Sequence, residues 1–567
     1  MSERITRRDF LKTTSTAAAA ASVAGCGVVL HGCAAGKKYD LVVKDGLVFD
    51  GLGRPGRMAD LGLLEGRIAS IGAIPASRGR SIIEAKGLAV APGFIDVHQH
   101  TDVELLVNPK AESVVRQGVT TVISGNCGSS PVPIAEAILE ENQKLLREQY
   151  GLELTWRDFD GFFRRLEKAG ISVNYGTLVG HGAIRGAAMG FSNRAAKSEE
   201  LDKMRAFVAA AMDDGALGFS SGLEYTPGSF APADELTALC RIVAEKGGVY
   251  ATHMRDEGGN LLEALDESVK TAVAAGVSLQ ISHLKTAYAS NWDKIDEAIA
   301  RIDAAQSAGL DILCDRYPYT AAATSLSYNF PIWAREGTTE ELLARLKDPT
   351  QDFRLRAAID ERERKLGSFD RVLIASVLTE KNKIYEGKNV QEGARMAGKK
   401  TYEFIRDLVI EERDQVGMVF FIMNEDNLKK FLAHPLVGIG SDASAAAPYG
   451  PLGKGKPHPR TYGTFPRALG KYVREEKVVP LAEMIRKMTS LPARKFRLAG
   501  RGIVEQGAAA DLVVFNPDMV ADRATWSDPH QYPVGIEAVV VNGVLIVDHG
   551  THTARPAGRI LRRVPKA

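Results

Sequence analysis

Six side chains that can bind a metal or move a proton follow short apolar runs, each where a buried strand would end: His98, His100, Cys127, His253, His283 and Asp442. His98 and His100 are two residues apart on one predicted strand, so both imidazoles point to the same side. A single pair of this kind is often only two surface histidines, and a single histidine often belongs to a hydrogen-bonded core. The whole set together predicts a metal site, and thiolate with imidazole favours Zn²⁺ over Mg²⁺ or Ca²⁺.

Cys127 and Asp442 carry the most specific chemistry of the set. Cys127 lies in the glycine-rich stretch Ser-Gly-Asn-Cys-Gly directly after an apolar run, which favours an accessible thiolate ligand over a buried thiol. Cys240 and Cys314 lie in apolar helical and strand contexts and are predicted to be packing residues. Asp442 follows the last apolar run, where a carboxylate can accept the proton of a metal-activated water. The alternative for Asp442 is a helix cap.

These residues need a scaffold that brings the ends of distant strands together. Between residues 91 and 499, β-branched apolar runs alternate with helical segments, which predicts βα units and a parallel sheet. Eight such units suggest a (β/α)₈ TIM-type barrel, whose active site lies at the carboxyl ends of its strands. The eight predicted strands are Phe94–His100, Val119–Cys127, Val173–His181, Leu217–Tyr225, Val249–Arg255, Ser278–Lys285, Asp311–Tyr319 and Val437–Ser444.

The two ends of the chain have a different pattern from the middle. Residues 39–50 alternate apolar and polar side chains around a Lys-Asp-Gly turn, which predicts a hairpin, and 538–548 do so around Asn-Gly. Residues 37–90 and 500–567 are therefore predicted to form one small β-sandwich domain that brackets the 91–499 barrel. A charged, helix-rich segment at 336–415 is predicted to be an insertion before the last barrel strand, with the apolar run 418–424 in the same connection.

Residues 1–36 are predicted to be a twin-arginine export signal, because Arg7-Arg8 precede Phe-Leu-Lys and an alanine-rich stretch too short to span a membrane. Cys26 lies in a sequence that resembles a lipoprotein processing site, so the mature protein is expected to be periplasmic or anchored by a lipid. No integral membrane span is expected after the signal is removed. A net charge of +2 gives no electrostatic reason to expect nucleic-acid binding, and five cysteines in 567 residues exclude a disulfide scaffold.

Several longer motifs resemble those of the amidohydrolase superfamily and, within it, the N-acyl-D-amino-acid deacylases, or D-aminoacylases. The similarity covers nearly the whole chain after the signal. The motifs are PGFIDVHQHTD (92–102), SGNCG (124–128), GFSSGLEYTPG (218–228), YATHMRDEG (250–258), ISHLKT (281–286), DRYPYTA (315–321), GIGSDAS (438–444) and PHPRTYG (457–463).

The resemblance implies a role for each matching residue. Cys127, His253 and His283 resemble the ligands of a tightly bound zinc ion, and His98 with His100 those of a weaker second site. Asp442 matches the catalytic acid/base. The positions that hold the acidic small-molecule substrate match Lys285, Tyr225, Arg460 and Tyr317. Relatives often place a hydroxyl residue near Ala323, so the side-chain preference of this chain is open.

The resemblance implies zinc-dependent hydrolysis of the amide bond of N-acyl-D-amino acids, which gives a carboxylate and a free D-amino acid. A dipeptidase that cleaves L-Xaa-D-Xaa dipeptides is a second possibility, because both substrates carry an amide next to a free carboxylate. A cyclic-amide hydrolase fits less well, since Cys127 stands where such enzymes use a bridging lysine. A non-catalytic metal-dependent binding lipoprotein has no need of the general base Asp442.

Overall fold

The computed structural model describes residues 38–564, so the export signal and Cys26 lie outside the described residues and stay predictions. Eight parallel strands are paired in sequence order, and a bridge between Gln99 and Ala443 joins the first to the last. The predicted α/β barrel of the TIM type is confirmed. Its strands are β6 (Phe94–Asp96), β7 (Val119–Ser124), β8 (Asn174–Gly180), β9 (Gly218–Gly222), β10 (Val249–His253), β11 (Ser278–Ile281), β12 (Ile312–Arg316) and β16 (Val437–Ile439).

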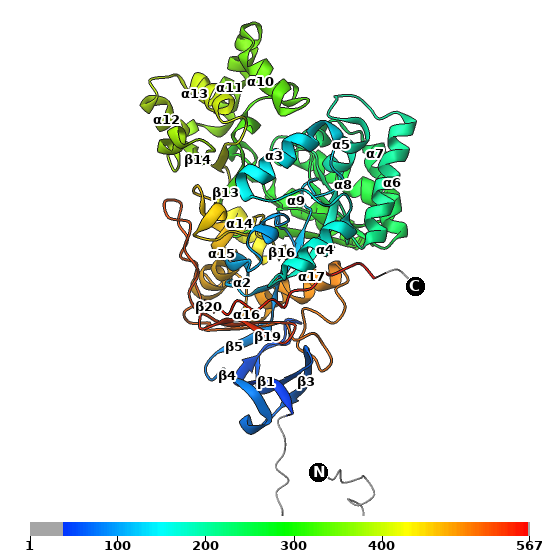
Figure 1. The fold of residues 1–567 in the computed structure, drawn as a ribbon, viewed down its shortest axis with the longest axis vertical. Coiled ribbons are helices and arrows are strands. Elements are labelled where there is room, and N and C mark those ends of the chain that lie inside the picture. Colours follow the sequence, from blue (N-terminus) through cyan, green and yellow to red (C-terminus); the bar gives the residue numbers. More distant parts are fainter. Residues whose placement is uncertain (1–37, 565–567) are drawn as a thin grey trace, which may run out of the picture.

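Amphipathic helices surround the barrel (Figure 1). In α7, the residues Leu236, Leu239 and Val243 are buried at the three- and four-residue spacing of one helix face. Helices between the strands include α4 (Phe159–Ala169), α5 (His181–Met189), α6 (Ser198–Asp214), α7 (Ala233–Glu245), α8 (Leu261–Ala275), α9 (Ile295–Ser307) and α14 (Glu425–Ala433). In residues 38–564, no helix is both long and apolar enough to cross a lipid bilayer.

Most of the barrel strands end a few residues before the predicted limits. After β7 the chain turns at Gly125, whose φ is +72° and whose missing Cβ would lie 2.0 Å from the Leu178 carbonyl oxygen. Only glycine fits there, so the backbone leaves the sheet before it reaches Cys127. The residues with metal-binding side chains at the strand ends are therefore mostly in the loops that follow the strands.

A buried ionic cluster joins α5 to α7 on the outside of the barrel. Glu235 accepts hydrogen bonds from Arg185 and from His181, the latter at 2.8 Å, and all three side chains are buried. Burial alone would raise the pKa of Glu235, but the hydrogen bonds and charges of His181 and Arg185 lower it. The Glu235 carboxylate is therefore held in its ionised form.

Replacing Glu235 by alanine should destabilise the protein by about 3–5 kcal/mol, because Arg185 would keep a buried charge without its carboxylate partner. A lower Tm in thermal unfolding measures the effect. The matched control is Glu245→Ala, which removes an exposed carboxylate from the same helix and should leave the Tm unchanged. Equal Tm values for the two variants would contradict the assignment.

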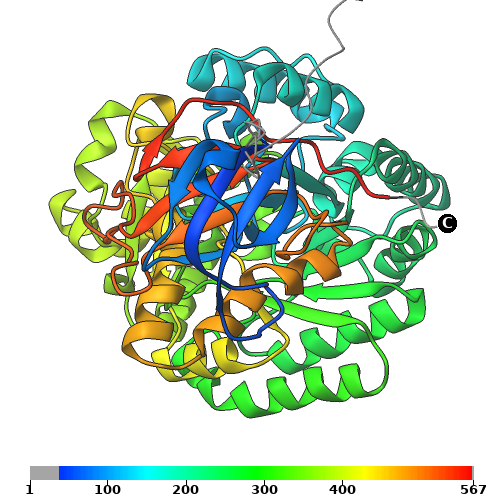
Figure 2. The ribbon, with the colours of Figure 1, turned by 90° about the horizontal axis from the view of Figure 1, so that it is seen from below.

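Strands from both chain ends form one nine-stranded sheet below the barrel, seen in Figure 2 as blue and red strands side by side. Leu61 and Leu63 share an apolar cluster with Leu512 and Val514, so the sheet folds back on itself as a sandwich. Its strands are β1 (Tyr39–Val48), β2 (Arg57–Leu64), β3 (Arg67–Gly72), β4 (Gly79–Glu84), β5 (Ala89–Pro92), β17 (Leu512–Phe515), β18 (Ile536–Val541), β19 (Val544–Asp548) and β20 (Thr551–His552).

The predicted hairpin at 39–50 is wrong, whereas the hairpin at 538–548 is confirmed. Residues 39–48 form the single strand β1, which carries a bulge between Val43 and Gly46. Asp60 of β2 binds both the Lys44 ammonium at 2.6 Å and the Asp45 amide at 2.8 Å. These contacts hold the Lys-Asp-Gly stretch against β2. The chain therefore forms a bulge at this point and continues as one strand, where the sequence predicted a turn.

The connection between β12 and β16 is a helix-rich unit with a small sheet of its own, at the top of Figure 1. The run at 418–424 lies mainly in the central strand of this sheet, which pairs with its two neighbours in antiparallel fashion. The elements are β13 (Ala321–Ser325), β14 (Val372–Ser376), β15 (Gly417–Phe421), α10 (Thr339–Lys347), α11 (Asp352–Leu366), α12 (Val390–Met396) and α13 (Thr401–Glu411).

Candidate active site

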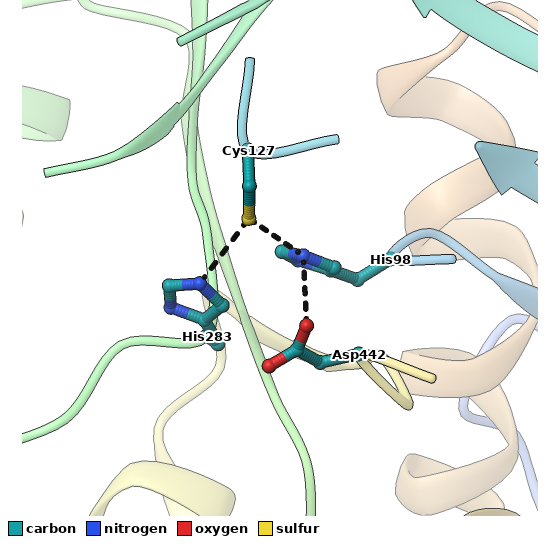
Figure 3. Close-up of side chains that lie close together, drawn as sticks. All are labelled: His98, Cys127, His283 and Asp442. Carbon is teal, nitrogen blue, oxygen red and sulfur yellow. Dashed lines mark hydrogen bonds and ion pairs between the residues drawn. The ribbon is translucent and has the colours of Figure 1, made fainter. Parts of the chain in front are cut away.

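The predicted metal ligands converge at the carboxyl ends of the barrel strands. One ligand atom each from His98, Cys127, His283 and Asp442 lies within 4.8 Å of the others (Figure 3). The Cys127 sulfur is 3.3 Å from His98 Nε2 and 3.4 Å from His283 Nε2. His253, with its ring centroid 4.5 Å from that of His283, belongs to a second group with His283 and Glu257. His283 thus takes part in both groups.

Hydrogen bonds between the first and last strands place His98 and Asp442 next to each other. The Asp442 amide donates to the His98 carbonyl oxygen at 2.8 Å, and the Ser441 amide donates to Asp96 Oδ1 at 2.9 Å. The Asp442 carboxylate then lies 3.1 Å from His100 Nε2 and 3.4 Å from His98 Nε2. The same contacts that close the barrel therefore position Asp442 over the histidine pair.

Three residues of the cluster have left-handed backbone conformations. The φ angles are +52° at Cys127, +33° at His283 and +53° at Asp442. Such angles are uncommon for residues other than glycine and are held by the surrounding structure. At His283 the amide donates to Asp315 Oδ1 at 2.8 Å, which fixes the turn.

The charges around Cys127 favour the anionic thiolate form of its side chain. Burial alone would raise its pKa, but the positive charges of His98 and His283 lower that pKa well below the usual range. Cys240 and Cys314 show the opposite effect, because burial raises the pKa of each of these thiols. Cys127 is thus the cysteine of the described chain whose surroundings favour thiolate, as a metal ligand requires.

The other ionisable side chains around Cys127 carry charges of both signs. Burial opposes ionisation of Asp442, but Arg460 and His98 hold the pKa of this carboxyl well below its usual range. Burial also opposes protonation of the imidazoles, yet Asp442 raises the pKa of His100 to about 9 and Glu257 raises that of His253 to about 10. Asp442 is therefore ionised near neutral pH and can accept a proton.

Two carboxylates that sequence reasoning did not single out orient the imidazoles. Asp315 Oδ1 lies 3.1 Å from His98 Nδ1, and Glu257 Oε1 lies 2.9 Å from His283 Nδ1. Each contact leaves the Nε2 atom directed at Cys127, which is the usual carboxylate–histidine–metal arrangement. Both residues lie inside motifs already noted, DRYPYTA and YATHMRDEG. Nothing in their residue type or spacing marks them as partners of the histidines.

The four predicted substrate-binding residues line the same cavity as the cluster. Arg460 makes an ion pair with Asp442 Oδ2 at 2.9 Å, and its guanidinium lies 4.6 Å above the Tyr317 ring. The Tyr317 hydroxyl is buried without a hydrogen-bond partner in the described structure. Lys285 is buried and bonds Glu257 at 2.5 Å, while the Tyr225 ring lies 4.9 Å from that of His253. Ala323 and Thr324 both line the cavity.

The residues present fit a bound metal ion. The donors are a thiol with a lowered pKa and imidazoles fixed by carboxylates; the ionised Asp442 carboxylate lies beside them, and Cys127, His283 and Asp442 line a cavity of about 660 Å³. A cation would compensate the anionic Cys127 and Asp442.

The fold and this site define the class of protein. The sequence profile of the amidohydrolase family matches residues 81–547. The chain belongs to the amidohydrolase family and is a hydrolase of amide C–N bonds.

Relatives narrow this class. The D-aminoacylase of Alcaligenes xylosoxydans xylosoxydans is 36% identical over 529 residues, which cover 93% of this chain and 98% of the relative. The N-acyl-D-glutamate deacylase of Bordetella bronchiseptica, solved with zinc and a phosphonate inhibitor, is 34% identical with a TM-score of 0.79, and covers 93% of this chain and 100% of its own. A D-aminoacylase described with a binuclear metal centre is 35% identical over the same shares, with a TM-score of 0.78. Within the family, the chain belongs with the D-aminoacylases.

Proposed function

We propose that this protein hydrolyses the amide bond of N-acyl-D-amino acids with the help of zinc, releasing a carboxylate and a free D-amino acid. The observation that carries the proposal is the meeting of a thiolate, imidazoles and an ionised aspartate with Arg460 in one cavity. Cys127, His253 and His283 would hold one tightly bound zinc ion. His98 and His100 would serve a weaker second site.

Each residue of the site has a separate task in the reaction. A zinc ion bound at the cluster would supply Lewis-acid polarisation of the amide carbonyl and of the attacking water. Asp442, ionised and beside His100, accepts the proton of that water and later donates it to the departing amine. Lys285 and Tyr225 face the cavity and can stabilise negative charge on the carbonyl oxygen. Arg460 and the Tyr317 hydroxyl can bind the substrate carboxylate.

A substrate panel tests the proposal directly. Zinc-loaded enzyme should hydrolyse N-acetyl-D-amino acids and leave the L-enantiomers nearly untouched. The panel includes L-Xaa-D-Xaa dipeptides and hydantoins, so a dipeptidase or a cyclic-amide hydrolase would be recognised by its own substrate. No turnover of any D-configured substrate would refute the proposed function.

Replacing Arg460 by lysine should raise KM for N-acyl-D-amino acids by about 10- to 100-fold, because a charge-assisted bond to the substrate carboxylate contributes about 1.5–3 kcal/mol. The matching D-amino acid amides lack the carboxylate, so their KM should change little. KM values for both substrates measure the effect.

The chain offers a matched control for this substitution. Arg467 also stacks on a tyrosine, Tyr319, and pairs with an aspartate, Asp522, but these residues do not line the cavity. Arg467→Lys should leave both KM values unchanged. A KM increase of equal size for the carboxylate and the amide substrates of Arg460→Lys would show that Arg460 does not bind the carboxylate.

A further inference from the structure

The cavity has two chemically different sides. Its charged lining residues lie near the cluster: Glu224, Glu257, Lys285, Asp442 and Arg460. By contrast, the described lining residues between 128 and 191 include no charged side chain, and six of them form an apolar wall: Ile138, Leu145, Leu146, Leu154, Trp156 and Phe191. These six residues are called the apolar wall below.

The barrel order places the apolar wall on a different side of the barrel mouth from the residues proposed to bind the substrate carboxylate. The wall comes from the segments that follow β7 and β8, whereas Tyr317 follows β12 and Arg460 follows β16. Around the closed ring of strands, β8 is four positions from β12, whereas β7, which precedes most of the wall, is three positions from β12 and two from β16. Cys127 and Gly128, at the start of the segment that supplies most of the wall, line the same cavity.

This arrangement favours one direction for a bound N-acyl-D-amino acid. With its carboxylate at Arg460 and its amide carbonyl at the cluster, the acyl group extends away from Arg460 and toward the apolar wall. The cavity has a volume of about 660 Å³, which is in the range that holds a drug-sized ligand. Such a ligand is far larger than an N-acetylamino acid.

The helix α3 (Leu139–Tyr150), labelled in Figure 1, supplies Leu145 and Leu146 to the wall. None of its residues is fully buried, yet Leu145 and Leu146 line the cavity and are half-buried. Apolar side chains that stay partly in water next to a cavity gain stability when an apolar ligand covers them. A short acetyl group would not reach them.

We infer that the apolar wall is the binding site for a medium- to long-chain fatty acyl group, so that the preferred substrates are N-fatty-acyl-D-amino acids. The inference rests on the proposed function and specifies its substrate class. Each methylene group that leaves water against the wall should improve KM by at most about fourfold.

The test compares acyl chains on one D-amino acid, kept below the concentration at which they form micelles. KM should fall steadily from the N-acetyl to the N-hexanoyl and N-decanoyl substrates. Leu145→Trp should narrow the wall and remove most of that gain. The matched control is Lys144→Trp, at a neighbouring residue whose side chain is 72% exposed, which should keep the gain.

Binding of the product acids separates failure of this inference from failure of the proposed function. Decanoate should bind more tightly than acetate in calorimetry, and Leu145→Trp should weaken decanoate binding, whether or not any substrate is hydrolysed. Turnover of N-acetyl-D-amino acids without any gain from longer acyl chains would overturn the inference and leave the proposed function standing. A gain from larger D-side chains in place of acyl chains would assign the wall to the side chain and would also overturn it.

Discussion

Asp442→Asn should lower kcat by about 10²–10⁴-fold, which is the usual contribution of a positioned general acid–base. The amide has nearly the same shape as the carboxylate, so it can still lie beside His100 and Arg460, but it cannot take up and return a proton. Zinc bound through Cys127, His253 and His283 should stay near its normal content. Steady-state kinetics and metal analysis on the same preparation measure the two effects.

A second aspartate provides the control for Asp442. Asp522 also pairs with an arginine, Arg467 at 3.2 Å, but lies outside the cavity lining. Asp522→Asn should keep turnover within about twofold of the unmodified protein, as is usual for a substitution away from the chemistry. A fully active Asp442→Asn protein would mean that another group moves the proton.

Cys127→Ala should remove most of the zinc and lower turnover by about a thousandfold or more, because the Lewis acid contributes several kcal/mol to the reaction. The Cys127 sulfur contacts both His98 and His283, so its loss leaves a gap at the centre of the cluster. Metal content after dialysis and kcat measure the result.

Thiol chemistry gives a test of Cys127 that does not depend on activity. Cys127 is partly exposed, whereas Cys240 and Cys314 are buried. In metal-free protein, Cys127 should react with an alkylating reagent much faster than the other two, and added zinc should protect it. Cys240→Ala should keep both the zinc and the protection. Retention of normal zinc content by Cys127→Ala would show that this thiol is not a ligand.

Much of the barrel and the cluster could be predicted from the sequence because their signals are local. Each strand is a short apolar run, and the metal-binding residues follow the runs at positions such as Cys127 and His253. In a barrel the carboxyl ends of all strands meet at one mouth, so the metal-binding residues that follow the strands come together there. The limits of the strands were less predictable, because a single residue such as Gly125 ends a strand through a close contact with a neighbouring strand.

Features that depend on long-range pairing were not predictable. In the sequence, Asp315 and Glu257 cannot be told apart from other acidic residues. Only the folded structure shows that they orient the imidazoles of His98 and His283. The bulge in β1 depends on Asp60 in the next strand. The sheet of the insertion depends on pairing of β15 with strands that are distant in sequence, such as β13, more than ninety residues earlier.

The nine-stranded sheet has a consequence for how the protein is made. Leu512 in β17 pairs with Pro92 in β5, and β5 therefore has β1 as a partner but lacks its second neighbour until the segment near residue 512 has left the ribosome. The sandwich can close only after nearly the whole barrel has been synthesised, so contacts between distant parts of the chain set the pace of its assembly. A nascent chain that stops before β17 would expose the apolar face of β1 and β5 and would be a target for chaperones and proteases.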